Sequence, residues 1–511
     1  MSGFDISLIM TFHSEGRLAH ISIRNALKCI EFARSFNINI ELIGIMDNIN
    51  ELTRRVVDRN FEIFNSLHEV FFGDLGPSRN FAINKASGKF IAFLDADDLF
   101  DENWLVKAFK TANQNINENY LYHPHYMFCF TDNLPSKYSL RRLYDFKNVQ
   151  YNDICLLEHC FWPSLCFGSK EIFLNTPYRS SVDGFGYEDW DFNCDVIANG
   201  YKHYIVAGTC QFVRIKENNS LSVEKLAQNK TLSYSKLFDQ PYLPKLLYKT
   251  TIYDKLIGRL YFYIQNLDPG IKIPVNSFIE NILNLNVDKH GIQSYYRHKY
   301  IPKWIQKLIP SLHKQEPKIF NDFHDDLKDN AIPKPFILDA FFRLKNKLTK
   351  AQFVLFLDKN SLNCDKQIAS ILSSLPKDNV FIISFGKLKN FDYNSYNFID
   401  LNKYTSWFYD CDKELLLLRL LVQLKPKIIY NFAQTNVNVL IFKYFKALSL
   451  NSRLNIVLND ITDFFKIQHN VLDNLFVQNY AKINFYSLND RVRKDYLTYY
   501  GINSDLIADL R

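Results

Sequence analysis

The sequence lacks several features that would assign the chain to a broad class at once. It has no run of about 18 uncharged apolar residues, so no segment is expected to span a membrane. It shows no signal-peptide pattern, because an apolar stretch typical of a strand begins directly after Asp5. Its net charge of +7 is small for 511 residues and does not indicate a general nucleic-acid-binding surface.

Cysteine is also scarce and scattered. The nine cysteines form no CxxC pair, and the spacing of Cys155, Cys160 and Cys166 fits no common zinc motif. We therefore expect buried free thiols in a reducing cytoplasm. A hydrophobic content of 47% and an aromatic content of 15% predict instead a globular chain, long enough for two to four domains.

One stretch combines an apolar run with a cluster of acids. Residues 90–94 are typical of a buried strand, and Asp95, Asp97 and Asp98 follow within four positions. Acids at this end of a parallel strand lie where open α/β sheets bind ligands. A divalent metal would relieve the repulsion between the carboxylates. The alternative is an acidic turn in which Asp98 or Asp101 is the N-cap of a helix over residues 104–112.

Strand and helix patterns alternate around this stretch. Expected strands cover residues 6–10, 38–46, 70–72 and 90–94, and expected helices cover residues 18–36, 51–65 and 79–86, the last with Ser78 as its N-cap. This alternation predicts a parallel, doubly wound α/β sheet. Side chains that are distant in sequence would then meet at the carboxyl edge of the sheet: Thr11, His13, Asp47, Arg79 and Asp95.

The order of these motifs resembles the GT-A glycosyltransferases of family 2. That family has a strand and loop for the base, an Asp after the second strand, an ARN-type helix leading into a strand, and a DxD motif. The matching segments here are Ser7–Glu15, Asp47, residues 76–91 and Asp95–Asp97. The resemblance covers roughly the first 220 residues and implies a Rossmann-like domain that binds a nucleotide-sugar.

The resemblance also implies roles for individual residues. Asp97 would bind a divalent metal, Mn²⁺ or Mg²⁺, and Asp95 would reach the ribose or the metal through water. Asp47 would accept a hydrogen bond from the base, most often uracil. Thr11 and His13 would line the base pocket.

An acidic pair follows about a hundred residues after the DxD in inverting members of the family. Glu188 and Asp189 occupy that place at the start of an expected helix. Asp189 would act as the general base that takes the proton from an acceptor hydroxyl, and Glu188 would orient the acceptor or tune Asp189. Carboxylates that stabilise the helix N-terminus are the alternative. Asp191 is expected to be structural.

Two positions depart from the family pattern. His13 and Ser14 stand where the family usually has Tyr and Asn, so contacts to the base are expected to differ. Lys216 stands where many members place a metal-binding His. A protonated Lys cannot ligate a metal but can pair with a phosphate, so we expect weaker metal dependence. Arg79 would lie near the diphosphate, with a helix-surface arginine as the alternative.

The rest of the chain divides into two further regions. Residues 1–222 would form the GT-A domain, and residues 223–350, with repeated prolines and no alternation, predict a mostly helical connector. Its basic, aromatic run 295–309 leaves two interpretations open, docking on a membrane surface or the solvated face of an interdomain helix.

Strand–helix alternation restarts at Gln352 and predicts a second Rossmann-like domain over residues 351–511. This unit weakly resembles the N-terminal half of a GT-B glycosyltransferase, whose donor site lies mainly in the other half. We therefore expect no sugar transfer from it as it stands. Either the chain is part of a longer two-enzyme protein, or this unit is a non-catalytic scaffold.

Together these features predict an inverting glycosyltransferase that moves a sugar from a nucleotide-sugar, most often a UDP-sugar, to a hydroxyl of a saccharide or lipid-linked glycan. The resemblance suggests bacterial capsule or lipopolysaccharide synthesis, in the cytoplasm or at the inner face of the membrane. A nucleotidyltransferase would show a Gly-rich phosphate loop, which Thr11–Glu15 lacks. A catalytically dead scaffold is the other alternative, and the intact Asp95, Asp97 and Asp189 argue against it.

Overall fold

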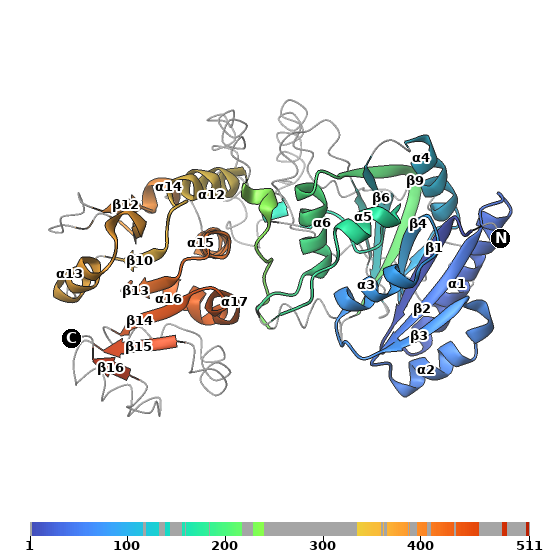
Figure 1. Ribbon diagram of the computed structural model, residues 1–511, viewed down its shortest axis with the longest axis horizontal. Coiled ribbons are helices and arrows are strands. Elements are labelled where there is room, and N and C mark those ends of the chain that lie inside the picture. Colours follow the sequence, from blue (N-terminus) through green and yellow to red (C-terminus); the bar gives the residue numbers. More distant parts are fainter. Residues whose placement is uncertain are drawn as a thin grey trace, which may run out of the picture.

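The protein is described by a computed structural model in two α/β units, each built on its own sheet (Figure 1). The structure describes residues 3–115, 119–131, 138–143, 156–158, 160–182, 184–216, 228–239, 335–358, 361, 365–386, 388, 396–405, 410–433, 436–458, 483–487 and 507–509. Most of the predicted connector, including the basic run 295–309, lies outside these residues.

The first unit has a mixed sheet with the strand order β3-β2-β1-β4-β8-β6-β9-β5 and with β7 paired to β6. Its strands are β1 (Ile6–Phe12), β2 (Ile40–Asp47), β3 (Ser66–Val70), β4 (Phe90–Asp95), β5 (Leu99–Phe100), β6 (Tyr120–Thr131), β7 (Tyr138–Arg142), β8 (Phe167–Ser169) and β9 (Lys202–Ile215). The strands β1 to β4 pair in parallel, as predicted. Beyond them, β8 runs antiparallel to β4, so the sheet is not parallel throughout.

The helices of the first unit connect these strands. They are α1 (Arg17–Arg34), α2 (Glu51–Asp58), the 3-10 turn η1 (Phe61–Ile63), α3 (Leu75–Lys85), α4 (Trp104–Gln114), α5 (Lys170–Asn175), α6 (Glu188–Ala198) and the 3-10 turn η3 (Lys236–Asp239). Hydrophobic clusters cover both faces of the sheet, and Phe90 to Leu94 are buried. A strand that is covered on both faces presents its polar end, Asp95, at the edge of the sheet.

Helix α3 begins earlier than the sequence predicts. The predicted cap at Ser78 is wrong, because the helix starts at Leu75 and the side chain of Asp74 accepts a hydrogen bond from the Gly76 amide at 3.2 Å. Pro77 fits in the first turn, where its missing N–H has no helical partner to lose. Ser78 is thereby free to donate its hydroxyl to Asp47 at 2.7 Å.

The second unit has a parallel sheet with the order β12-β11-β10-β13-β14-β15-β16, which confirms the predicted second Rossmann-like unit. Its strands are β10 (Phe353–Leu357), β11 (Val380–Ser384), β12 (Asn397–Asp400), β13 (Ile428–Asn431), β14 (Arg453–Leu458), β15 (Ile483–Ser487) and β16 (Ile507–Asp509). Its helices are α12 (Pro335–Lys347), α13 (Asp365–Ser374), the 3-10 turn η5 (Lys377–Asn379), α14 (Asn402–Thr405), α15 (Asp410–Leu424), α16 (Asn436–Lys443) and α17 (Phe445–Ser449).

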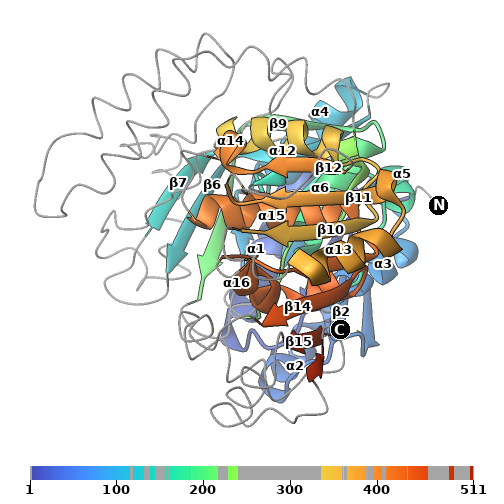
Figure 2. The same ribbon diagram turned by 90° about the vertical axis from the view of Figure 1, so that its left-hand side faces the viewer.

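Helices α6, α15 and α17 lie between the two sheets (Figures 1 and 2). One hydrophobic cluster runs through both units and includes Phe185 from the first and Leu417 and Ala447 from the second. Arg419 of α15 is buried in this contact, where it donates to the Thr231 hydroxyl at 2.9 Å. Continuous apolar packing of this kind favours a fixed arrangement of the two units.

The cysteines and the helices of the described residues bear on two expectations, that of free buried thiols and that of no membrane-spanning segment. Six of the cysteines whose side chains the structure describes are free thiols, and five of these are buried. Of the helices found there, none combines the length and apolar composition that crossing a bilayer would require.

Candidate active site

At the carboxyl edge of the first sheet, the end of β4 carries an ion pair between the fully buried Arg79 and the partly exposed Asp95. Thr11 of β1 is the register partner of Asp95, which places the two residues side by side. The Arg79 guanidinium donates to one carboxylate oxygen of Asp95 at 2.9 Å, and the Ser164 hydroxyl donates to the other at 2.9 Å. Three separate segments therefore meet at Asp95.

Arg79 is fully buried, so the interpretation of a helix-surface arginine is wrong. Its guanidinium lies over the rings of Phe93 and Tyr178, at 5.6 and 5.2 Å from their centroids. Burial alone would lower its pKa, but the negative charge of Asp95, with smaller contributions from Tyr178 and Glu188, raises the pKa above its usual value. A permanent positive charge is thus fixed beside the DxD motif.

A second ion pair joins Asp97 to Lys216, the residue after β9. The Lys216 ammonium lies 2.6 Å from the Asp97 carboxylate. Burial acts to lower the pKa of Lys216, yet attraction to Asp97 raises it overall, so this side chain is held as a cation. Glu15 lies close by, and burial, with repulsion from Asp97, raises its pKa.

The third acid of the motif has a structural role. Asp98 is buried and accepts a hydrogen bond from the Arg214 amide at 2.8 Å, which fastens the turn after β4 to β9. Burial raises its pKa well above the usual range, and the charges of Asp97 and Asp95 add to this effect. The capping alternative is wrong in detail, because Asn103, and neither Asp98 nor Asp101, is the N-cap of α4.

Two of the residues predicted to contact the base, Asp47 and His13, lie side by side. The Asp47 carboxylate accepts from the Gly73 amide at 2.9 Å, the Asp74 amide at 3.2 Å and the Ser78 hydroxyl at 2.7 Å, and so it holds the loop between β3 and α3. His13 lies beside it, with Nδ1 2.8 Å from the Asp47 carbonyl oxygen. The two predicted residues are together, and Asp47 in addition holds this loop in place.

The predicted acidic pair opens helix α6. Glu188 is buried, and its charge contributes to the raised pKa of Arg79, so Glu188 lies within electrostatic reach of the Arg79–Asp95 ion pair. Asp189 accepts a hydrogen bond from the Trp190 amide at 2.8 Å. Asp191 points elsewhere and accepts from the Ser233 amide and hydroxyl at 3.0 and 2.7 Å, in line with the structural role expected for it.

Some residues of the site were not identified from the sequence. Ser164 contacts Asp95 across 69 positions, and Tyr178 packs on Arg79 from the loop after α5. Neither residue belongs to a motif with fixed spacing. Only the antiparallel strand β8 and the loops around it bring them to the carboxyl edge.

The first unit is similar in sequence to known proteins. Residues 7–175 match the family model described as glycosyl transferase family 2. The uncharacterized glycosyltransferase MJ1057 of Methanocaldococcus jannaschii is 31% identical over 160 residues, which are 31% of this chain and 53% of the relative. The chain therefore spans about half the length of the curated relative that it matches.

Solved structures with some similarity include TarS of S. aureus. TarS 1-349 in complex with UDP-GlcNAc has 13% identity and a TM-score of 0.34, with 62% of this chain and 82% of that chain covered. A structure of TarS with 14% identity and a TM-score of 0.33 covers 58% and 57%. Over residues 7–175, the first unit of this chain is therefore similar to glycosyl transferase family 2.

Proposed function

We propose that the first unit transfers a sugar from a nucleotide-sugar donor, a UDP-sugar, to a hydroxyl of a glycan or lipid-linked glycan acceptor, with inversion at the anomeric carbon. The observation that carries this proposal is the meeting of two cations and two acids at the carboxyl edge of one sheet, with Glu188 of α6 within electrostatic reach of Arg79. Arg79 and Lys216 are held next to Asp95 and Asp97, and the charge of Glu188 acts on Arg79. Asp189 follows Glu188 on the same helix turn.

The chemistry follows from the charges. As the bond between the sugar and the diphosphate breaks, negative charge grows on the leaving group, and fixed cations nearby stabilise it. Arg79 and Lys216 would supply that stabilisation. Asp189 would accept the proton of the attacking hydroxyl, and a carboxylate on the side of the sugar opposite the leaving group produces inversion. Glu188 would orient the acceptor.

A divalent metal at this site would need free carboxylate oxygens on Asp95 and Asp97. Asp97 is paired with Lys216, and Asp95 is bonded to Arg79 and Ser164, so both predicted ligands already have partners. Within the described ranges, no group of three or more His, Cys, Asp or Glu side chains could hold a metal. The residues therefore do not fit a metal held by the protein alone. This supports the hypothesis that Lys216 takes over the electrostatic role of the metal.

The acceptor and the cellular role follow from the family resemblance and belong to the same proposal. Surface polysaccharide synthesis, as capsule or lipopolysaccharide, would place the chain in the cytoplasm beside a lipid-linked glycan. The second unit would transfer no sugar itself.

A thermal-shift screen of nucleoside diphosphates and nucleotide-sugars, each with excess EDTA or with Mn²⁺, tests this function. Binding to the folded state raises the midpoint by mass action. We expect UDP and a UDP-sugar, but not CMP, to raise the midpoint in EDTA, and Lys216→Ala to need Mn²⁺ for the same shift. A wild-type response that requires Mn²⁺, with Lys216→Ala unchanged, would refute the role of Lys216. No response to any nucleotide would refute the donor site.

A further inference from the structure

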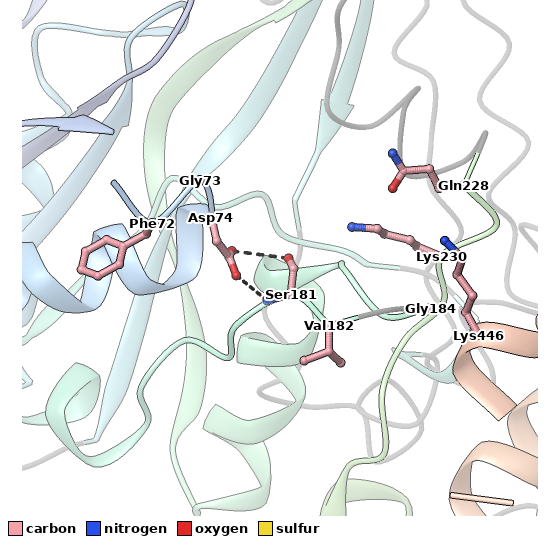
Figure 3. Close-up of a pocket in the computed structure, with 9 residues that line it drawn as sticks. All are labelled: Phe72, Gly73, Asp74, Ser181, Val182, Gly184, Gln228, Lys230 and Lys446. Carbon is pink, nitrogen blue, oxygen red and sulfur yellow. Dashed lines mark hydrogen bonds between the residues drawn. The ribbon is translucent and has the colours of Figure 1, made fainter. Parts of the chain in front are cut away.

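A cavity of about 340 Å³ lies where the two units meet, outside the site around Asp95 (Figure 3). Four segments line it: the loop after β3, the loop before α6, the segment that begins at Gln228, and helix α17. The lining residues are Phe72, Gly73, Asp74, Ser181, Val182, Gly184, Gln228, Lys230 and Lys446. A cavity of this size can enclose one monosaccharide unit.

The cavity holds two lysines that face the same space. Figure 3 shows the Lys230 and Lys446 side chains, one from each unit, with their ammonium ends on the cavity side. Neither forms an ion pair with any residue in the described part of the chain. The carboxylate of Asp74 accepts instead from the Ser181 amide at 2.5 Å and the Gly76 amide at 3.2 Å. Two neighbouring cations repel each other, and an anion between them would relieve this repulsion.

The cavity adjoins two parts of the candidate active site, the loop held by Asp47 and the segment before Glu188. Its wall residue Gly73 donates its amide hydrogen to Asp47 at 2.9 Å. On the other side, the Lys230 stem lies against Gly186, where an added Cβ would come within 2.4 Å of Lys230 Cδ. Gly186 precedes Glu188 by two residues. A ligand in the cavity would therefore lie beside the acidic pair and apart from the Arg79 and Lys216 cations.

Backbone contact fixes the two lysines relative to each other. Gly184, with φ of +82°, approaches α17 so closely that an added Cβ would lie 2.1 Å from the Ala447 nitrogen. Ala447 is the residue after Lys446, and Gly184 also accepts from the Thr231 amide, next to Lys230, at 2.9 Å. Because this contact needs a residue without a side chain, the cavity is a consequence of how the units pack.

We propose that this cavity is an acceptor subsite that binds an anionic sugar unit of the glycan, one that carries a phosphate or a carboxylate. The inference rests on the proposed function and adds to it the charge of the acceptor. Lys230 and Lys446 bind the anion. The second unit then contributes to acceptor recognition through Lys446.

Isothermal titration of the full chain tests this subsite with glucose 6-phosphate and glucuronate as probes, glucose as the uncharged control, and saturating UDP in the cell. We expect at least one anionic probe to bind in the presence of UDP, and glucose to bind much more weakly. Lys230→Gln and Lys446→Gln should each weaken binding about tenfold, in the range of a charge-assisted hydrogen bond, and the double variant should abolish it. Lys403→Gln, an exposed lysine on α14, is the matched control.

Separate outcomes address the donor site and the subsite. UDP binding by wild type and double variant alike keeps the proposed function, whereas a wild type that binds no UDP refutes it. Displacement of the anionic probe by UDP, equal binding of glucose, or equal affinity in the lysine variants would each overturn the subsite. Lysine-dependent flotation with phosphatidylglycerol vesicles, without binding of either soluble anion, would overturn it in favour of a lipid headgroup.

Discussion

The two sheets of this chain carry polar residues at their carboxyl edges in different ways. In the first unit, Asp95 and Asp97 are bonded to cations from other elements, Arg79 and Lys216. In the second unit, Asp358 and Asn431 bond to nearby groups of their own segments, while the Ser361 hydroxyl donates to the Phe432 carbonyl at 2.9 Å. Asp358 accepts from the Ser361 amide at 3.0 Å, and Asn431 donates to Asn438 and accepts from the Ala433 amide. The same sheet geometry therefore serves two purposes.

We interpret this difference as one between a sheet edge that binds a substrate and a sheet edge whose polar groups only stabilise loops. Cations fixed by burial need no rearrangement when a ligand binds. Local Asx-type bonds satisfy backbone groups and place no cation at the edge of the sheet. The contrast supports the proposal that only the first unit transfers sugar.

The largest expected effect is on catalysis. Asp189→Asn keeps the shape of the side chain but removes the proton acceptor, so we expect kcat to fall by about 10²- to 10⁴-fold, the usual contribution of a general base. Binding of UDP should persist. Asp358→Asn is the matched change at the second edge and should leave kcat unchanged. Turnover that survives Asp189→Asn would remove the base assignment.

A second change tests the ion pair at Asp95. Arg79→Met leaves the partly exposed Asp95 without its cation, and loss of a hydrogen bond to a charged group typically costs about 1.5–3 kcal/mol of unfolding free energy. Arg343→Met breaks an ion pair with Asp339 on the exposed face of α12 and should cost at most about 1 kcal/mol. Urea denaturation measures both. Equal losses would mean that the two units do not differ in how they hold charge.

A third change tests acid sensitivity, which should come from buried histidines in the first unit. His203 stacks on Trp162 at 3.7 Å between ring centroids and lies 2.8 Å from His123. Burial lowers the pKa of His203 to about 3, whereas an unfolded His titrates near 6.5. Below about pH 6.5 His203 therefore binds a proton in the unfolded state but stays neutral in the folded state. Stability falls as the pH drops toward 3.

The variant His203→Phe keeps the stacking and removes this proton. Burial raises the pKa of Asp191 and of Asp101 to about 6, which acts in the opposite direction as the pH falls through 6. The contribution of His203 is therefore measured as the difference in pH slope of the unfolding free energy between variant and wild type. We expect the pH slope of unfolding free energy between 4 and 6 to decrease by about 1.4 kcal/mol per pH unit. Identical slopes would contradict the prediction.

The smallest expected effect concerns the contact between the units. Gly184→Ala adds a Cβ 2.1 Å from the backbone of α17 at a φ of +82°. Gly200→Ala has a similar φ of +86° but meets nothing within 4 Å, so it measures the conformational cost alone, about 1–2 kcal/mol. We expect Gly184→Ala to cost about 1–3 kcal/mol more, the range for overpacking. Equal midpoints in urea would show that the units separate without loss.

Much of the first unit could be predicted from local pattern. The strands around residues 6–12, 40–47 and 90–95 and the parallel order of β1 to β4 follow from periodicity and alternation. Helix α3 was misplaced because Gly76 and Pro77 favour a loop, while the cap at Asp74 starts the helix before them. The antiparallel strand β8 was missed because its partner in β4 lies far away in sequence.

The sequence by itself determined which residue types lie at the ends of the strands: Asp95 and Asp97 after β4, Asp47 at the end of β2, and Glu188 with Asp189 at the start of α6. Periodicity encodes this locally. Only the tertiary structure decided which cation meets which carboxylate, that Arg79 is buried, and that Arg419 reaches Thr231 across 188 residues. Such contacts depend on packing between distant segments, which no local propensity specifies.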